Sequence, residues 1–150
     1  MKKFSLTVIT VVKNDEKNIE KTIKSIIFQK TIKFEYIIVD GGSNDKTLKI
    51  IKKYKNFIKK IISEKDVGIY DAMNKGIKMS NNDIIVFCNS GDFFYKNSLK
   101  SVIKIFNEKN VDFVFGTVRR NYTSASIVRF GFDPKRIFYN FDFATAHSTG

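Results

Sequence analysis

Acidic and polar side chains gather at four places in the chain, each directly after a run of apolar residues. These places are residues 13–15, 40–45, 63–66 and 89–92. Carboxylate, amide and hydroxyl oxygens bind hard cations, and they also form hydrogen bonds with nucleotide bases and sugar hydroxyls. Turn formation alone explains any single cluster, because Asp, Asn, Ser and Gly are also common turn residues. Four such clusters in a basic protein indicate a binding site.

The cluster that begins at Asp40 has the residue types of a nucleotide or sugar site. Asp40 can accept hydrogen bonds from a base or a sugar hydroxyl, and Gly41 and Gly42 permit close approach of the backbone to a ligand. The chain contains neither Gly-x-Gly-x-x-Gly nor Gly-x-x-x-x-Gly-Lys-Ser/Thr. The dinucleotide-binding and phosphate-loop classes therefore lose their main support.

The cluster that ends in Asp92 could hold a metal ion. A carboxylate on a tight turn after a buried strand can bind Mg²⁺ or Mn²⁺, with diphosphate oxygens and waters as further ligands. Such a cation can act as a Lewis acid toward a departing nucleoside diphosphate. A single Asp after Gly91 is also common in plain turns, so both interpretations stay open at this point.

The apolar runs before these clusters are typical of buried strands. Residues 4–12, 34–40 and 83–89 are nearly continuously apolar and rich in β-branched residues, as in interior strands of a parallel sheet. A shorter strand is expected at residues 58–63. Apolar residues at helical spacing predict four helices, near residues 19–27, 45–54, 68–79 and 98–107. This alternation predicts an α/β protein whose ligands bind beyond the carboxyl ends of the strands.

The regular pattern ends at Gly116. Residues 112–116 form a last strand-like run, and residues 117–150 mix short apolar pieces with arginines. No repeat or Pro/Gly-rich linker marks a second domain. We therefore expect a single domain over residues 1–150, and the abrupt end at Gly150 is expected to be a truncation.

The composition excludes several classes of protein. The 150 residues carry 27 Lys and Arg against 15 Asp and Glu, a formal net charge of +12, and 43% are hydrophobic. That hydrophobic content predicts a packed core. Cys88, the only cysteine, lies in an apolar run and is expected to be a core thiol. Because no run reaches the roughly 20 apolar residues of a membrane span and the N-terminus is a poor signal peptide, a cytoplasmic protein is predicted.

The excess positive charge is mostly lysine spread along the chain. Solvated helix faces are the simplest interpretation, and attraction to an anionic membrane surface is the second. Neither an arginine-rich tract nor an array of aromatics beside basic residues supports nucleic-acid binding, so no nucleic-acid partner is predicted. The densest lysine cluster comprises Lys52, Lys53, Lys55, Lys59 and Lys60.

Together these motifs resemble those of the family 2 glycosyltransferases, which have the GT-A fold. The resemblance is carried by residues 7–14, 39–47, 63–76 and 87–92. The third stretch is the most specific, with the pattern Asp-x-Gly-x-x-Asp-Ala-x-Asn-x-Gly. The resemblance implies a Rossmann-like three-layer sandwich with a mainly parallel central sheet, incomplete at its C-terminal end.

The resemblance also implies how the chain is divided and which residues bind the nucleotide. Residues 1–116 would bind a nucleotide sugar, and residues 117–150 would begin the acceptor side. Thr10 and Asp40 would lie against the nucleotide base, and Asp66 would lie near the base and ribose. The helix that follows Gly68 would run beside the nucleotide, with two further contact candidates, Asn74 and Lys75.

By the same resemblance Asp92 would hold the Mg²⁺ or Mn²⁺ that bridges the diphosphate. The family commonly has two successive acids at this turn, whereas this chain has Gly91 in the first position. His147 aligns with a histidine on the acceptor side of related enzymes, although a surface or packing role is equally open. The general base of an inverting transfer follows the region where this sequence ends, so the base is expected to be absent from this chain.

The sequence therefore predicts a metal-assisted, inverting glycosyltransferase in surface polysaccharide synthesis. It would move a sugar from a nucleoside diphosphate sugar, with UDP expected, to a glycan or lipid-linked acceptor, at the inner face of the membrane. The alternative is a catalytically incomplete fragment that binds the nucleotide sugar without transfer. A nucleotidyltransferase is disfavoured because the first strand is not followed by a glycine-rich loop.

Overall fold

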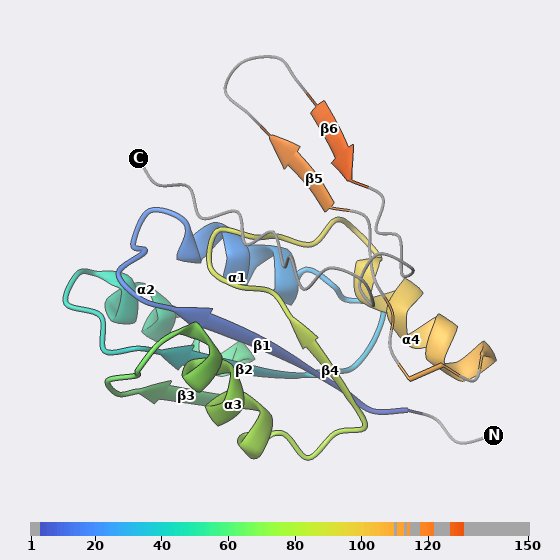
Figure 1. Cartoon of the computed structure of the whole chain (residues 1–150), viewed down its shortest axis with the longest axis horizontal. Coiled ribbons are helices and arrows are strands. Elements are labelled where there is room, and N and C mark those ends of the chain that lie inside the picture. The colour runs from blue at the N-terminus through green and yellow to red at the C-terminus, as the bar shows by residue number, and fades with distance from the viewer. Residues whose placement is uncertain (1–3, 110, 113, 115–117, 122–126, 131–150) are drawn as a thin grey trace, which may run out of the picture. The chain divides into compact units, whose positions relative to one another are not determined.

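Four parallel strands form the central sheet, in the order β3-β2-β1-β4 (Figure 1). The computed structural model describes residues 4–109, 111, 112, 114, 118–121 and 127–130. The strands are β1 (Leu6–Val12), β2 (Glu35–Asp40), β3 (Lys60–Ser63) and β4 (Ile84–Phe87).

The two middle strands are buried on both faces, which explains their nearly continuous apolar sequences. All seven residues of β1 are buried, and in β2 only Glu35 is partly accessible. Because side chains alternate across a strand, Val8 and Val12 join one apolar cluster while Ile9 and Val11 join another on the opposite face. The sheet therefore needs helices on both of its faces.

Helices cover both faces and complete a three-layer sandwich. Buried residues of α1 (Ile19–Ile27), α2 (Thr47–Lys53) and α4 (Ser98–Glu108) pack in the cluster that contains Val8. Helix α3 (Ile69–Met79) packs through Ala72 on the other face, and a short 3-10 helix, Lys55–Phe57, follows α2. The predicted α/β architecture is confirmed, and the element ends differ from the predictions by at most a few residues.

A glycine lets α3 lie directly on the sheet. A Cβ atom at Gly76 would come within 2.6 Å of Cγ2 of Ile9 in β1, closer than two carbons can approach. The glycine at the end of the Asp-x-Gly-x-x-Asp-Ala-x-Asn-x-Gly pattern is thus explained by packing between α3 and β1. The absence of a side chain at Gly76 allows α3 to pack close to the sheet.

The chain divides into two compact units, residues 1–111 and residues 112–150. The second unit contains β5 (Val118–Asn121) and β6 (Ile127–Phe130), which pair antiparallel with Val118 opposite Phe130. The sequence did not predict this hairpin, because residues 117–150 show no regular apolar pattern. The strand expected at residues 112–116 lies mostly outside the described residues.

None of the helices in the described part of the chain is long and apolar enough to span a membrane.

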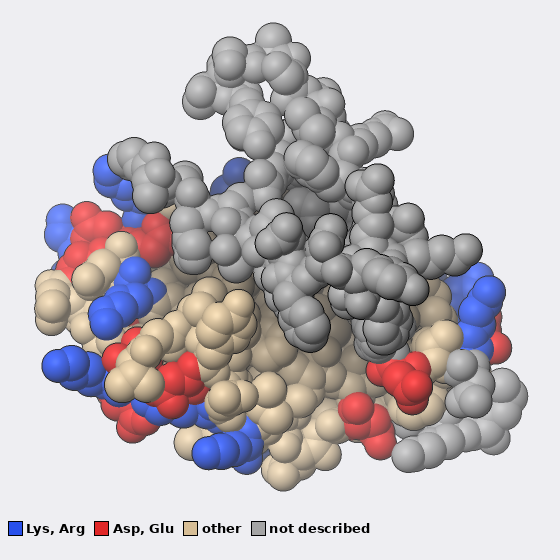
Figure 2. Space-filling view, viewed as in Figure 1, with Lys and Arg blue, Asp and Glu red and all other residues tan. Residues whose placement is uncertain are grey.

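On the face shown in Figure 2, acidic side chains are grouped among lysines at the end of the molecule toward which β1, β2 and β3 point. The net charge of +12 is thus accompanied by a local concentration of carboxylates at that end.

Candidate functional site

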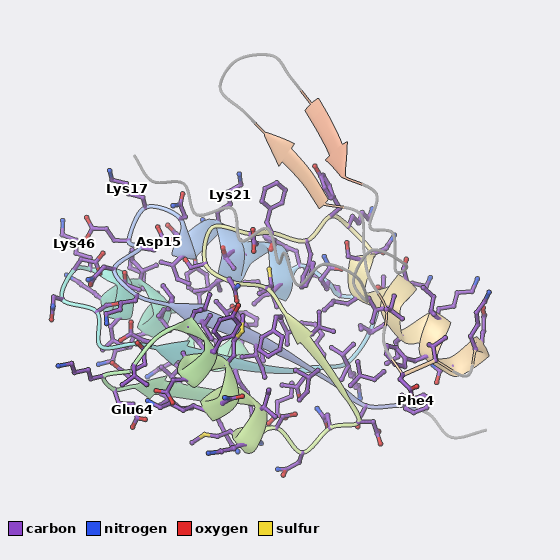
Figure 3. The ribbon with its side chains drawn as sticks, in the orientation of Figure 1. Phe4, Asp15, Lys17, Lys21, Lys46 and Glu64 are labelled. Atoms are coloured by element: carbon purple, nitrogen blue, oxygen red, sulfur yellow. The ribbon has the colours of Figure 1, made fainter. Side chains whose placement is uncertain are left out.

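The predicted polar clusters meet at one edge of the sheet. Val12 pairs with Asp40, and Asp40 pairs in turn with Ser63, so three parallel strands end side by side. Figure 3 shows Asp15 and Glu64 at this end of the sheet and Phe4 at the other end. We call this edge the carboxyl rim. It is where parallel α/β sheets bind their ligands.

Asp40 is fully buried and organises the loops of the rim. Its carboxylate accepts hydrogen bonds from the amide and hydroxyl of Ser43 and from the hydroxyl of Ser63, the last at 2.7 Å. Because Asp40 is fully buried, a direct contact with a base would require the loops around it to move. The expected contact with a nucleotide base therefore stays a prediction.

Asp66 lies against the backbone of Gly41. Its carboxylate is only 7% exposed, lies 3.8 Å from Nζ of Lys13, and accepts a hydrogen bond from the amide of Gly68. A Cβ atom at Gly41 would lie 2.1 Å from Oδ2 of Asp66. The first glycine after Asp40 therefore leaves the space that Asp66 occupies, which links two motifs that are far apart in the sequence.

A pocket of about 350 Å³ opens beside Asp66, at the end of β1 and the start of α3. This volume lies within the range of small-molecule sites. The lining is apolar except for one acid and one lysine, as expected of a site that stacks a planar ring and fixes it by a few polar contacts. The lining residues are Val11, Val12, Lys13, Asp66, Val67, Gly68, Ile69 and Ala72.

Lys75 holds the loop that carries Asp66. Its Nζ lies 2.9 Å from Glu64 and 3.1 Å from Asp71, and it donates a hydrogen bond to the carbonyl of Lys65. The hydrogen bond with Glu64, followed by that with Asp71, raises the pKa of Lys75. Neither Lys75 nor the exposed Asn74 lines the pocket, so their predicted nucleotide contacts stay predictions.

Asp15 connects the end of β1 with the turn after β4. Its carboxylate accepts hydrogen bonds from the Ser90 hydroxyl at 2.6 Å and from Asn18, and its amide donates to Thr47. Asn18 is at the cap position of α1, and Asn14 is bonded to the loop after β2 through Ser43 and Asn44.

The turn after β4 presents two oxygen donors suited to a hard cation. The Oδ1 atom of Asn89 is buried and has no hydrogen-bond partner among the described residues, whereas Asp92 is exposed to solvent. Although Asp92 is exposed, protein atoms around its carboxyl group desolvate it and raise its pKa. A nearby cation would offset that cost and would satisfy the Asn89 oxygen, so these residues fit a Mg²⁺ or Mn²⁺ site.

The described part of the chain has no group of three or more His, Cys, Asp or Glu side chains that could hold a metal by themselves. A cation at this turn would therefore need oxygens from a bound diphosphate and from water. Gly91 has a φ of +94°, a conformation that favours glycine. That conformation gives a physical reason for glycine where the related enzymes commonly have an acid.

Two polar residues of α1 and one just after it position this turn, and none of them was predicted from the sequence. The Thr22 hydroxyl donates to the Asp92 carbonyl at 2.7 Å and accepts from the Gly91 amide. The Ser25 hydroxyl accepts from the Phe94 amide, and buried Gln29 donates to the Tyr95 carbonyl. Polar residues at helical spacing among the buried isoleucines of α1 were the available signal.

Thr10 does not reach the rim as a free side chain. It is fully buried, its hydroxyl donates to the Cys88 carbonyl at 2.7 Å, and it lies 3.0 Å from the Tyr36 hydroxyl. The expected contact of Thr10 with a nucleotide base therefore stays a prediction. Thr10 is a core residue that joins β1 to β2 and to the end of β4. Buried Cys88 is confirmed as a core thiol.

His147, the predicted acceptor-side candidate, lies outside the described residues.

A second hollow, of about 590 Å³, lies at the opposite end of the sheet and is lined by residues that include Glu35 and Asn82. Although it is larger, it is away from the carboxyl rim and from all the predicted site residues. The pocket beside Asp66 is therefore the better candidate.

Known proteins resemble this chain in both sequence and structure. A sequence model of the family described as Glycosyl transferase family 2 matches residues 7–144. Poly(ribitol-phosphate) beta-N-acetylglucosaminyltransferase TarP of Staphylococcus aureus is 33% identical over 77% of this chain and 36% of its own length. The Escherichia coli enzyme UDP-Glc:alpha-D-GlcNAc-diphosphoundecaprenol beta-1,3-glucosyltransferase WfgD is 26% identical over 93% of this chain and 55% of its own length.

Among solved structures, S. aureus TarS residues 1–349 in complex with UDP-GlcNAc superposes with a TM-score of 0.65 and 28% identity. The match covers 69% of this chain and 31% of that one. A mannosyltransferase from Pyrobaculum calidifontis with GDP-Man and Mn²⁺ has a TM-score of 0.64 at 20% identity and shows a shared fold. The chain thus spans about a third of the length of the first relatives it matches. By its motifs, its parallel sheet and the match over residues 7–144, the chain belongs to glycosyl transferase family 2.

Proposed function

We propose that this chain is the donor-binding part of a glycosyltransferase that takes a sugar from a UDP-sugar. The observation that carries the proposal is the carboxyl rim, which joins an apolar pocket beside Asp66 to the oxygen donors of Asn89 and Asp92. The pocket would take the uridine and the turn would lie at the diphosphate. A nucleoside diphosphate has this combination of a flat ring and a multiply charged end.

The names of the relatives support a UDP donor and an acceptor that is a polymer or is linked to a lipid. TarS binds UDP-GlcNAc, TarP acts on poly(ribitol-phosphate), and the name of WfgD states a UDP-Glc donor and a diphosphoundecaprenol-linked acceptor. For this chain we propose a glycan or lipid-linked acceptor in surface polysaccharide synthesis. A cytoplasmic protein at the inner face of the membrane fits that role.

In this proposal Asp66 fixes the base and ribose, and Asp40 sets the shape of the loops around them. Asn74, which is exposed on α3, stays a candidate for a nucleotide contact. Asp92 and Asn89 would hold Mg²⁺ or Mn²⁺. Such a cation supplies Lewis-acid stabilisation of the departing diphosphate.

Transfer with inversion requires a base that removes the proton of the acceptor hydroxyl while that oxygen attacks the anomeric carbon. The new bond forms on the face opposite the departing UDP. We assign no described residue to the role of base. His147 stays a candidate only for contact with the acceptor.

The test is calorimetric titration with UDP and GDP, each with and without Mn²⁺. We expect UDP binding that Mn²⁺ strengthens, and the variant Asp92→Asn should lose that strengthening, about tenfold or more in affinity. Glu108→Gln is the matched control, because Glu108 is exposed on α4 and its ion pair with Lys104 is a 3.8 Å contact. Absence of binding to both nucleotides would refute the proposed donor site.

Transfer itself is tested by release of UDP from UDP-GlcNAc and UDP-Glc in the presence of a polyprenyl-diphosphate sugar acceptor. Release of UDP that depends on the acceptor would support the proposed transferase activity. Binding without any release would instead support the alternative of a nucleotide-sugar-binding fragment.

A further inference from the structure

The outer face of α1 and the loop after β4 expose aromatic rings next to lysines. Phe28, at the end of α1, is 63% exposed, and Tyr95 is 51% exposed. Phe93 lies between Tyr95 and Lys21. Its ring centroid is 5.6 Å from that of Tyr95 and 4.3 Å from Nζ of Lys21. We call this the basic-aromatic surface and define it by Lys17, Lys21, Lys24, Phe28, Phe93 and Tyr95.

The aromatic residues of this surface are held together by the fold. Buried Gln29, next to Phe28, donates a hydrogen bond of 2.9 Å to the carbonyl of Tyr95. Ser25 of α1 accepts a hydrogen bond from the amide of Phe94. The end of α1 and the loop after β4 are therefore tied together, and their exposed rings form one surface.

These rings are not needed for the core. The inward face of α1 is already filled by Ile19, Ile23 and Ile26, which are completely buried. Burying a Phe or Tyr ring away from water is favourable. These exposed rings would gain that free energy only if a partner covered them. Aromatic side chains with polar surroundings are typical of sites that lie at a membrane–water interface.

The charges around the rings are positive. Among the described residues, Lys17 and Lys21 form no ion pair, and Figure 3 shows both pointing away from the sheet on the side of Asp15. Lys24 is partly neutralised by Glu20, whose carboxylate lies 3.3 Å away and also accepts a hydrogen bond from Tyr54. Lys17 and Lys21 can therefore attract anions.

We propose that the basic-aromatic surface docks the protein on an anionic lipid bilayer. The lysines would lie at the lipid phosphates, and the rings of Phe28 and Tyr95 would enter the headgroup layer. This proposal deepens the proposed function, which places the protein at the inner face of the membrane, by naming the surface that docks. The docking itself does not depend on the nucleotide. Since Phe93 directly follows Asp92, docking would bring the turn after β4 close to the bilayer, where a lipid-linked acceptor lies.

Sedimentation with large unilamellar vesicles tests the proposal. One set contains phosphatidylcholine alone, and the other contains equal parts of phosphatidylcholine and phosphatidylglycerol. We expect binding to the anionic vesicles and little to the neutral ones. The pair Lys17→Gln/Lys21→Gln should weaken that binding about thirtyfold, and Phe28→Ser/Tyr95→Ser should weaken it about tenfold or more.

The matched control is Lys55→Gln/Phe57→Ser. Phe57 is also 63% exposed and lies beside the densest lysine cluster, on the 3-10 helix after α2. This control should keep the binding of the unchanged chain. The proposal is overturned if the control loses as much binding as either test pair, or if neutral and anionic vesicles bind equally.

Further measurements distinguish bilayer docking from loss of the fold and from binding to soluble polyanions. Circular dichroism shows whether each variant is folded. Calorimetry with UDP tests the donor site separately, and a folded chain that binds vesicles but not UDP would refute the proposed function and leave the docking intact. Binding to soluble polyphosphate is the last measurement. If polyphosphate binds as tightly as the anionic vesicles and the aromatic pair changes neither, the surface recognises a soluble polyanion and the docking proposal is wrong.

Discussion

At the scale of single residues, the site depends on side chains that are placed by backbone contacts. Asp66 occupies space that Gly41 leaves open, and Asp40 is held by Ser43 and Ser63. These acids come from loops after different strands. Their positions therefore depend on the small size and the hydrogen bonds of their neighbours, as well as on their own charge.

Replacing Gly41 with alanine should displace Asp66. The added Cβ would lie 2.1 Å from its carboxylate oxygen, so the loop must move. We expect UDP affinity to fall by about tenfold, because a buried polar contact is worth about 1–3 kcal/mol. Calorimetry on Gly41→Ala, Asp66→Ala and the double variant checks this. If Gly41→Ala costs as much affinity without Asp66 as with it, the contact is not the cause.

Tyr36 should give the protein a stability that decreases in strong alkali. Burial raises the pKa of Tyr36 well above its usual value of 10.0. Since the folded state holds this proton more tightly than the unfolded state, the contribution is complete below pH 10 and is lost as the pH rises above it. Spectrophotometric titration of folded chain should show one tyrosine that ionises only with unfolding.

The control for this titration is Tyr36→Phe, which keeps the ring and removes the ionising group. The late ionisation should disappear in this variant. Its free energy of unfolding at neutral pH should fall by only about 1 kcal/mol, because Thr10 keeps its hydrogen bond to the Cys88 carbonyl. A late ionisation that persists in Tyr36→Phe would contradict the assignment.

At the scale of elements, α1 and α3 each hold one side of the rim. Thr22 and Ser25 of α1 bind the turn after β4, and Lys75 of α3 binds the loop that contains Asp66. Each helix also packs its apolar face on the sheet. The same elements that form the core therefore position the loops of the site.

Lys75→Met should loosen the Asp66 loop without unfolding the protein. The lost contacts are partly exposed, so we expect only about a threefold to tenfold loss of UDP affinity. Lys75→Arg should restore most of it, because a guanidinium can also bridge Glu64 and Asp71. Calorimetry gives the affinities, and hydrogen exchange at the Val67 amide, which donates to Asp71, reports the loop. Lys78→Met, an exposed change on the same helix, is the control. Equal losses in both variants would rule out a positioning role for Lys75.

At the scale of the whole molecule, parallel topology brings the chemistry together. Strands β1, β2, β3 and β4 run in one direction, so polar clusters separated by up to about half the chain meet at one edge. On the face shown in Figure 2, acidic side chains are grouped among lysines at the end that carries the rim, and further acidic side chains lie toward the other end. In our proposals, a cation shared with a diphosphate lies at this rim, and the lysines of the basic-aromatic surface contact lipid.

The sequence by itself determined the α/β class, the four parallel strands and the positions of the polar clusters. These follow from short-range patterns: apolar runs, helical spacing and residues after strand ends. It did not predict the hairpin of β5 and β6, because residues 117–150 lack such a pattern. The strand predicted at residues 112–116 lies mostly outside the described residues. The predicted site residue His147 also lies outside them.

Only the tertiary structure decided which of these polar residues are accessible and which are part of the core. Thr10 lies within an apolar run and Asp66 follows one, but Thr10 is enclosed by Tyr36 and Cys88 whereas Asp66 borders a pocket. The fit of Asp66 against Gly41 and the support of Asp92 by Thr22 likewise join residues far apart in the sequence. Accessibility and such contacts depend on how distant segments pack, and a local sequence pattern does not contain that information.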